Sequence, residues 1–385
     1  MKLIVRLALL TTAAFLLIAA AAPAAVTKAF DGALDCTVRA DGTRACQGVV
    51  NSFDGAPIDV NLFLPPEPAS GPDGGYPLLM EFHGWGGSKL SGSQRWTENG
   101  YAYFSMSDRG WGMSCGGMDP KRPTPACANG FNHLMDTRYE VRDAQELVGR
   151  LVDDGIVDPT RIGTMGGSYG GGISMALSAL KNRKMMPDGA LVPWTSPDGT
   201  PIAIAAAAPD IPWTDLAYSL LPNGRTLDYV EDAPYGAGPI GIMKQTFVSG
   251  LFGTGLATSN YAPPGTQPDA DLINWYSLIS AGEPYDSNPA AEDIADEVTT
   301  HHSSYYIDDS VTPPPMLISN GWTDDLFPPD EAIRFYNRTK ANHPGAKISL
   351  LFSDHGHQRG QNKAADTALR RQRVQAFFDH PIIWP

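Results

Sequence analysis

The segment RIGTMGGSYGGGISMALSALKNR, residues 161–183, constrains the fold of this chain more than any other. It opens with a short run that follows the turn-forming residues DPT, which is typical of a strand. The residues after the glycines have helical spacing, and one helix face would hold Ile173, Ala176, Leu177 and Leu180. Glycines fill the space between the two. The segment therefore predicts a strand, a sharp turn and a helix that packs back against the strand.

The same alternation of strand and helix runs from about residue 77 onward, after a β-rich opening. Strands are predicted within residues 58–65, 76–87, 101–110, 202–213, 314–325 and 347–357, and helices within 133–154, 330–341 and 363–380. This order predicts βαβ units, and so an α/β fold with a mostly parallel central sheet flanked by helices. Residues 213–300 interrupt the rhythm with Gly, Pro, Asn and aromatic residues. We expect them to form a cap inserted over the sheet.

The N-terminus has the pattern of an export signal. Lys2 and Arg6 precede an apolar run, and small residues follow it at Ala22–Ala25. We expect residues 1–25 to be a signal peptide and residues 26–385 to form one α/β domain that includes the cap, secreted or periplasmic. An uncleaved membrane anchor is the alternative, although the apolar run is barely long enough to span a bilayer.

Charge and cysteine content indicate which classes of partner and which compartment to expect. The formal charge of −14 argues against nucleic acid or an anionic membrane as a partner. The four cysteines fit an exported protein with disulfides, and they allow three pairings. Short separations favour Cys36 with Cys46, around an Asp-Gly turn, and Cys115 with Cys127, around a Pro-rich loop. There is no C-x-x-C motif, so neither a metal site nor a redox pair is predicted.

Two serines match G-x-S-x-G, the pattern of a nucleophile on a tight strand–helix turn. Ser168 lies between the predicted strand and helix. Ser114 precedes CGGMDPKRPTPAC, whose prolines cannot continue a helix. Ser168 is therefore the predicted nucleophile and Ser114 a loop residue.

An acid and a histidine should follow the nucleophile in chain order. Asp324 and Asp325 come after one predicted strand, and His355 and His357 after the last one. Such positions gather at the carboxyl edge of a parallel sheet. An Asp pair before Pro-Pro could instead cap a helix, and a loop histidine could simply face solvent.

The oxyanion of an acyl-transfer intermediate needs two backbone donors. One should be the N–H of Tyr169, directly after the nucleophile, and the other the N–H of Trp85 or Gly84 in the loop HGWGG. His83 is expected to brace that loop.

The segments SDRGWGMSCG, GGSYGG, GWTDDLFP and GHQRG together resemble the Xaa-Pro dipeptidyl-peptidase and cocaine-esterase group of α/β-hydrolases. The resemblance covers residues 50–385, without the C-terminal jelly-roll domain that group members usually carry. It implies Asp324 as the acid, His357 as the base, and a structural loop around Ser114. The D-x-R-G-x-G-x-S-x-G pattern is met only in part, because Asp108 directly precedes Arg109. The loop HGWGG also differs from the tyrosine hydroxyl that cocaine-esterase-like enzymes use in the oxyanion hole.

These observations predict an α/β-hydrolase fold and a serine hydrolase that cleaves an ester or peptide bond with no cofactor or metal. The substrate would be a small molecule or a peptide. Aromatic residues of the cap (Trp213, Tyr218, Tyr229, Trp275 and Tyr276) would line its pocket or simply pack in the cap, and Asp228, Glu231 and Asp232 could hold a peptide's free amine. Two alternatives stay open, a polymer or polysaccharide-ester esterase and a non-catalytic binding protein on the same fold. The oligomeric state does not follow from the sequence.

Overall fold

The computed structural model describes residues 25–222, 241–283, 285, 288–357 and 362–379. All of the expected signal peptide except its last residue lies outside these ranges. No helix within them is long and apolar enough to cross a membrane.

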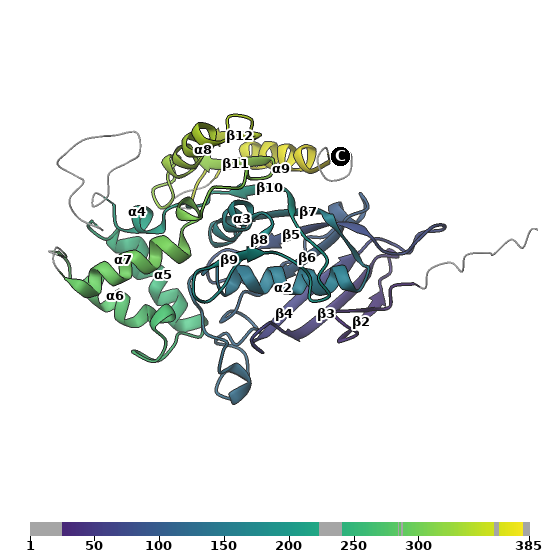
Figure 1. Cartoon of the computed structure of the whole chain (residues 1–385), viewed down its shortest axis with the longest axis horizontal. Helices are drawn as coiled ribbons and strands as arrows, with labels where there is room; N and C mark the ends of the chain where they lie inside the picture. The colour runs from purple at the N-terminus through teal and green to yellow at the C-terminus, as the bar shows by residue number, and fades with distance from the viewer. Residues whose placement is uncertain (1–24, 223–240, 284, 286–287, 358–361, 380–385) are drawn as a thin grey trace, which may run out of the picture.

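A ten-stranded sheet forms the centre of the molecule (Figure 1). Its order is β1-β2-β3-β4-β6-β5-β7-β10-β11-β12, and the strands from β6 to β12 run parallel while the first four are antiparallel. The strands are β1 (Lys28–Ala29), β2 (Leu34–Val38), β3 (Arg44–Asn51), β4 (Pro57–Leu64), β5 (Tyr76–Phe82), β6 (Ala102–Met106), β7 (Val157–Gly167), β10 (Ile204–Asp210), β11 (Met316–Gly321) and β12 (Ile348–Ser353). A separate hairpin consists of β8 (Arg183–Met185) and β9 (Leu191–Pro193). The predicted α/β architecture is confirmed.

Helices cover both faces of the sheet. They are α1 (Gln94–Thr97), α2 (Glu140–Asp153), α3 (Tyr169–Leu180), α4 (Leu216–Leu220), α5 (Gln245–Thr258), α6 (Leu272–Ser280), α7 (Pro289–His302), α8 (Asp330–Asn342) and α9 (Ala364–Phe378), with 3₁₀ turns at Pro125–Cys127, Pro268–Ala270 and Ser304–Tyr306. Residues of α2 and α3 belong to one apolar core, and Trp96 of α1 and Phe378 of α9 belong to a second core on the other face. Figure 1 shows α4, α5, α6 and α7 grouped at one side of the sheet.

The alternation of side chains along β5 divides these two cores. Leu78, Met80 and Phe82 lie in the core beneath α2 and α3, whereas Leu79 lies in the core beneath α1 and α9. All four are buried. A strand that is apolar on both faces is characteristic of a central parallel sheet, because helices cover it from both sides.

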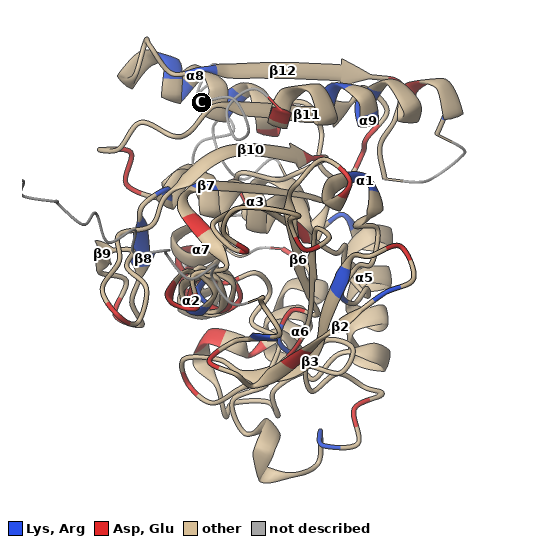
Figure 2. Cartoon of the chain, turned by 90° about the vertical axis from the view of Figure 1, so that its right-hand side faces the viewer, with Lys and Arg blue, Asp and Glu red and all other residues tan. Residues whose placement is uncertain are grey.

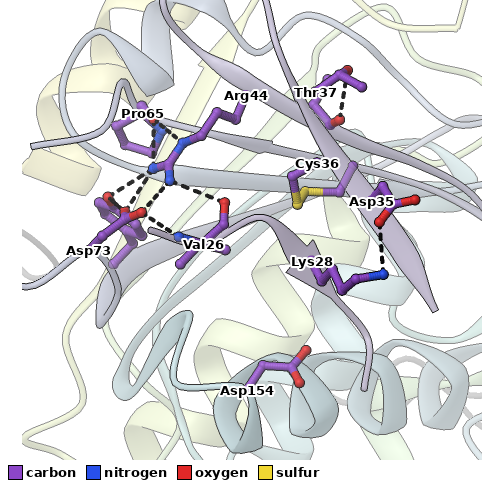
Figure 3. Close-up of a disulfide and its surroundings, with 12 residues drawn as sticks. Val26, Lys28, Asp35, Cys36, Thr37, Arg44, Pro65, Asp73 and Asp154 are labelled. Carbon is purple, nitrogen blue, oxygen red and sulfur yellow. Dashed lines mark hydrogen bonds and ion pairs between the residues drawn. A yellow bond between two sulfur atoms is a disulfide. The ribbon is translucent and has the colours of Figure 1, made fainter. Parts of the chain in front are cut away.

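One disulfide fastens the antiparallel edge of the sheet (Figure 3). Cys36 of β2 and Cys46 of β3 are directly opposite each other, and the chain turns between them at Gly42 with φ +82°. Beside the bridge, the buried Arg44 guanidinium pairs with the Asp73 carboxylate and donates to the Pro65 carbonyl at 3.0 Å. The second bridge joins Cys115 to Cys127. Both predicted pairings are confirmed, and neither leaves a free thiol.

The helix predicted over residues 133–154 begins only at Glu140. Leu134 and Met135 have φ near +60°, so the chain before the helix cannot be helical. The Glu140 carboxylate accepts hydrogen bonds from the His133 N–H at 2.7 Å and the Asp136 N–H at 2.9 Å. The predicted helix therefore began too early in the chain, because the Glu140 side chain holds the residues before it in a turn.

Candidate active site

Ser168 lies at the turn between β7 and α3 and has φ +58° and ψ −115°. Non-glycine residues rarely occupy this backbone region, and strain of this kind is characteristic of a nucleophile on a strand–helix turn. The glycines two residues before and after the serine make the turn possible. A Cβ on Gly166 would lie 2.8 Å from the Phe82 carbonyl oxygen, and a Cβ on Gly170 would collide with the same oxygen. The turn projects the serine side chain above the carboxyl end of the sheet.

The structure brings Ser168, His357 and Asp324 together. His357 Nε2 lies 2.6 Å from Ser168 Oγ, and His357 Nδ1 lies 2.8 Å from Asp324 Oδ2. These are hydrogen-bond distances, and the arrangement is that of a serine-hydrolase triad, in which the carboxylate orients the imidazole and the imidazole takes the serine proton. The three residues follow β7, β11 and β12, as the sequence predicts.

Backbone donors fix the Asp324 carboxylate. Its Oδ1 accepts hydrogen bonds from the N–H groups of Leu326 and Phe327, each at 3.0 Å, and its Oδ2 accepts one from the His357 N–H at 3.0 Å. The Phe327 ring meets the His357 imidazole edge-on at a centroid distance of 5.0 Å. Because both the carboxylate and the ring are held in place, the imidazole faces Ser168 without further rearrangement.

The rival histidine belongs to another network. His355 is buried, its Nδ1 lies 2.8 Å from Ser353 Oγ, and its Nε2 lies 3.3 Å from Asp210 Oδ1. Asp210 also pairs with Arg370. These contacts connect β10, β12 and α9, so His355 has a structural role. His357 is the histidine that faces Ser168.

Ser114 is also placed away from the reacting groups. Its side chain is fully buried, its hydroxyl donates to the Ser107 carbonyl at 2.7 Å, and it accepts from the Asp59 N–H at 2.7 Å. The next residue, Cys115, is in a disulfide. The Ser114 side chain, in the second G-x-S-x-G match, therefore fastens its loop to β4.

The two expected oxyanion donors lie next to Ser168. Tyr169 is the first residue of α3, where a backbone N–H has no partner within the helix. Gly84 approaches closely, since a Cβ on it would lie 4.0 Å from Ser168 Cβ. Trp85 lines the same cavity as Ser168, and its indole N–H donates to the Leu251 carbonyl of α5 at 2.8 Å. The loop and the start of α3 therefore both adjoin the serine, and their role as oxyanion donors stays a prediction.

His83 braces this loop, as expected from the sequence. Its Nδ1 lies 2.8 Å from the Gly84 carbonyl oxygen, and its Nε2 accepts from the Asp108 N–H at 3.0 Å. Burial lowers the pKa of His83 to about 4, and burial raises the pKa of Asp108 well above its ordinary range. A neutral imidazole of this kind holds the loop without adding charge beneath it.

An apolar cavity of about 140 Å³ opens beside Ser168. It lies between the turn at Ser168 and the α4–α7 helices. None of the lining side chains that the structure describes carries a charge at neutral pH. The walls include three of the aromatic residues singled out in the sequence, Trp213, Trp275 and Tyr276.

Of the remaining candidates, only Tyr218 is among the described residues, and it does not line this cavity. Tyr218 lies beneath the Arg334 guanidinium, 4.5 Å from ring centroid to Cζ. Tyr229, Asp228, Glu231 and Asp232 lie outside the described residues. The apolar wall that α5 contributes was not predicted, whereas two residues of the α6 wall, Trp275 and Tyr276, were among the candidates.

Neighbouring carboxylates and a histidine behind the cavity form an ion-pair cluster. One oxygen or nitrogen from each of Asp136, Glu297 and His302 lies within 4.8 Å of the others. The Arg138 guanidinium pairs with both carboxylates. His302 is buried and also lies 2.8 Å from the Leu134 carbonyl through Nδ1. The Arg138 guanidinium and the His302 imidazole are therefore the partners of the two carboxylates in this cluster.

Comparisons with known proteins agree with this fold. The acetyl xylan esterase (AXE1) family matches residues 36–197, which include Ser168 and Trp85. No curated protein shows a significant match to the chain.

Solved structures resemble the chain over most of its length. An acetyl xylan esterase from Paenibacillus sp. R4 has 16% identity and a TM-score of 0.52, covering 89% of this chain and 88% of the esterase. A post-proline cleaving enzyme from Rickettsia typhi has 16% identity and a TM-score of 0.54, and an acylaminoacyl peptidase from Pyrococcus horikoshii has 13% and 0.53. Each alignment covers 89% of this chain but only 38% and 42% of the respective peptidase. The fold is that of the α/β-hydrolases, and the chain is a serine hydrolase of the esterase or peptidase type.

Proposed function

We propose that the protein is an exported carboxylic ester hydrolase that works through an acyl-enzyme on Ser168. The observation that carries the proposal is the 2.6 Å separation of His357 Nε2 from Ser168 Oγ, with Asp324 on the other ring nitrogen. The strained turn, the adjacent backbone donors and the cavity support the same conclusion.

In the proposed reaction, Ser168 Oγ attacks the ester carbonyl carbon while His357 Nε2 accepts the hydroxyl proton. The carbonyl oxygen becomes an oxyanion, which the N–H groups of Tyr169 and Trp85 (or Gly84) stabilise. The tetrahedral intermediate collapses, the C–O bond to the alcohol breaks, and His357 returns the proton to the departing alcohol. Water then attacks the acyl-enzyme by the same steps, and the carboxylic acid leaves.

An ester is favoured over a peptide substrate for two reasons. An alkoxide or phenolate is a better leaving group than an amine, so it requires less of the general acid. A dipeptidyl peptidase also needs a negative group to hold the substrate's free amine, whereas the described cavity walls are uncharged. Xaa-Pro dipeptidyl-peptidase-like cleavage is therefore the less favoured form of the proposal.

A polysaccharide-ester esterase is the second candidate. The match of residues 36–197 to the acetyl xylan esterase family supports it. Under this alternative the acyl group would be acetyl and the alcohol a sugar hydroxyl.

Export is supported by the two disulfides, because such bonds persist in oxidising compartments. The partner we propose is a small ester and not nucleic acid. Figure 2 shows Lys and Arg interspersed with Asp and Glu along the ribbon in that view. The formal charge of −14 also disfavours binding to a polyanion.

The test compares ester and amide turnover in matched variants. The purified protein should hydrolyse p-nitrophenyl butyrate with a higher kcat/KM than it hydrolyses Ala-Pro or Gly-Pro p-nitroanilide. Ser168→Ala should abolish ester turnover, and Ser114→Ala should retain the fold and the activity. If the anilides are cleaved as well as the ester, the peptidase form replaces this proposal, and if Ser168→Ala retains turnover, the proposed mechanism is wrong.

A further inference from the structure

Two helices direct an apolar face at the cavity beside Ser168. Val248, Leu251 and Phe252 of α5 line it, at spacings that place them on one side of that helix. Trp275 and Ile279 of α6 do the same from the other helix. All five are only partly buried, although residues of these types are usually buried in full. Their exposed surface faces a space that the described residues leave open.

The polar atoms on these walls are few, and several already have partners. The Tyr276 hydroxyl bonds to Ser249 Oγ at 3.0 Å, and the Trp213 indole N–H bonds to the His302 carbonyl at 2.7 Å. The Trp85 indole N–H donates a hydrogen bond to the Leu251 carbonyl. A sugar ring with several hydroxyls would lose its hydrogen bonds to water here and regain few from the protein. An apolar group would lose no hydrogen bonds to water on entering. An apolar cavity of this size is large enough for a benzene-sized group.

We propose that this cavity binds the apolar portion of the ester, so that the substrates are esters of fatty or aromatic character and not acetylated sugars. The inference rests on the proposed function, because the cavity opens at the serine that would be acylated. The methyl group of an acetyl ester would leave most of the space empty. Each added methylene that enters the cavity leaves water, which should raise kcat/KM about fourfold, equivalent to about 0.8 kcal/mol.

The first experiment varies one side of the ester at a time in the wild-type protein. p-Nitrophenyl acetate, butyrate and hexanoate vary the acyl chain, and methyl, butyl and hexyl acetate vary the alcohol. We expect kcat/KM to rise at least tenfold from the shortest to the longest member of one series. If neither series rises, or if an acetylated xylo-oligosaccharide is the best substrate, the inference is overturned. If no ester is hydrolysed at all, the proposed function fails instead.

A matched pair of variants locates the effect. Val248→Phe places a larger side chain on the cavity wall, and the preference for the longer ester should fall at least fivefold. Leu256→Phe makes a similar change in the same helix, at an exposed residue two turns further on that does not line the cavity, and should leave the preference unchanged. Equal effects of the two substitutions would contradict the proposal.

Inhibition of the wild-type protein gives a second measurement that does not depend on a variant folding. Alkylboronic acids bind the nucleophilic serine of such enzymes reversibly and carry only the alkyl group. From methyl- to butylboronic acid, the inhibition constant should fall about fourfold per methylene. A constant that does not depend on chain length, together with a flat ester series, would show that the cavity does not bind the alkyl group.

Discussion

Replacing Ser168 by glycine should give a more stable protein than replacing it by alanine. Both substitutions remove the hydroxyl and its 2.6 Å hydrogen bond to His357, so that loss cancels in the comparison. The two variants differ in the Cβ alone. At φ +58° and ψ −115° a Cβ is strained, whereas glycine has no Cβ to strain.

The magnitude follows from two opposing effects. Relief of the backbone strain is worth about 1–3 kcal/mol. Glycine also gives the unfolded chain more conformational freedom than alanine, which costs about 0.4–1 kcal/mol. The net expectation is that Ser168→Gly is more stable than Ser168→Ala by about 1 kcal/mol.

Urea unfolding measures this difference. With a denaturant slope of about 3 kcal/mol/M, the midpoint of Ser168→Gly should lie about 0.3 M above that of Ser168→Ala. Ser114 supplies the control, because its φ is not positive: there Gly should be the less stable of the two variants. If Ala is equal to or more stable than Gly at residue 168, the turn is not strained and the reasoning is wrong.

Three further predictions concern the base, a disulfide and a buried carboxyl. His357→Ala should lower kcat for p-nitrophenyl butyrate by at least a thousandfold, whereas His355→Ala should retain most of the activity of the molecules that fold; equal losses would contradict the assignment. Replacing both Cys115 and Cys127 by serine should lower the free energy of unfolding by about 3 kcal/mol, measured in urea against the oxidised wild type. An unchanged free energy of unfolding would refute the expected role of this disulfide. Burial raises the pKa of Glu140 from 4.5 to about 8, so the folded protein binds the extra proton between those values and stability falls as pH rises through that window, by up to about 1.4 kcal/mol per pH unit. Glu140→Gln should remove this part of the slope, and an unchanged slope would show that Glu140 does not titrate there.

The triad could be predicted from the sequence because its signals are local. Ser168 lies in a glycine pattern that a sharp turn requires, and Asp324 and His357 each follow an apolar strand. Parallel strands end at the same edge of the sheet, so the order of the elements alone brings the three residues near each other. The expected disulfides needed only short separations along the chain.

The cavity could not be predicted in the same way. α5 contains Gly250, Gly253 and Gly255, which lower helix propensity and are typical of a loop. Gly255 has a tertiary reason that the sequence does not reveal, since a Cβ there would collide with the Tyr261 ring. The helix is therefore stabilised by packing, and its apolar face becomes visible only once the fold is known.

The position of His355 depends in the same way on a distant residue. Its partner Asp210 is 145 positions earlier in the chain. The order of the elements alone left both histidines open as the base. The family resemblance favoured His357, and the geometry shows that His357 faces Ser168 while His355 connects strands.

The central claim is that Ser168 is the nucleophile, and a covalent label tests it most directly. The wild-type protein would be treated with a fluorophosphonate, digested and mapped by peptide mass spectrometry. The account predicts a single adduct on Ser168, lost in Ser168→Ala and retained in Ser114→Ala. An adduct on Ser114, or labelling that survives in Ser168→Ala, would contradict it.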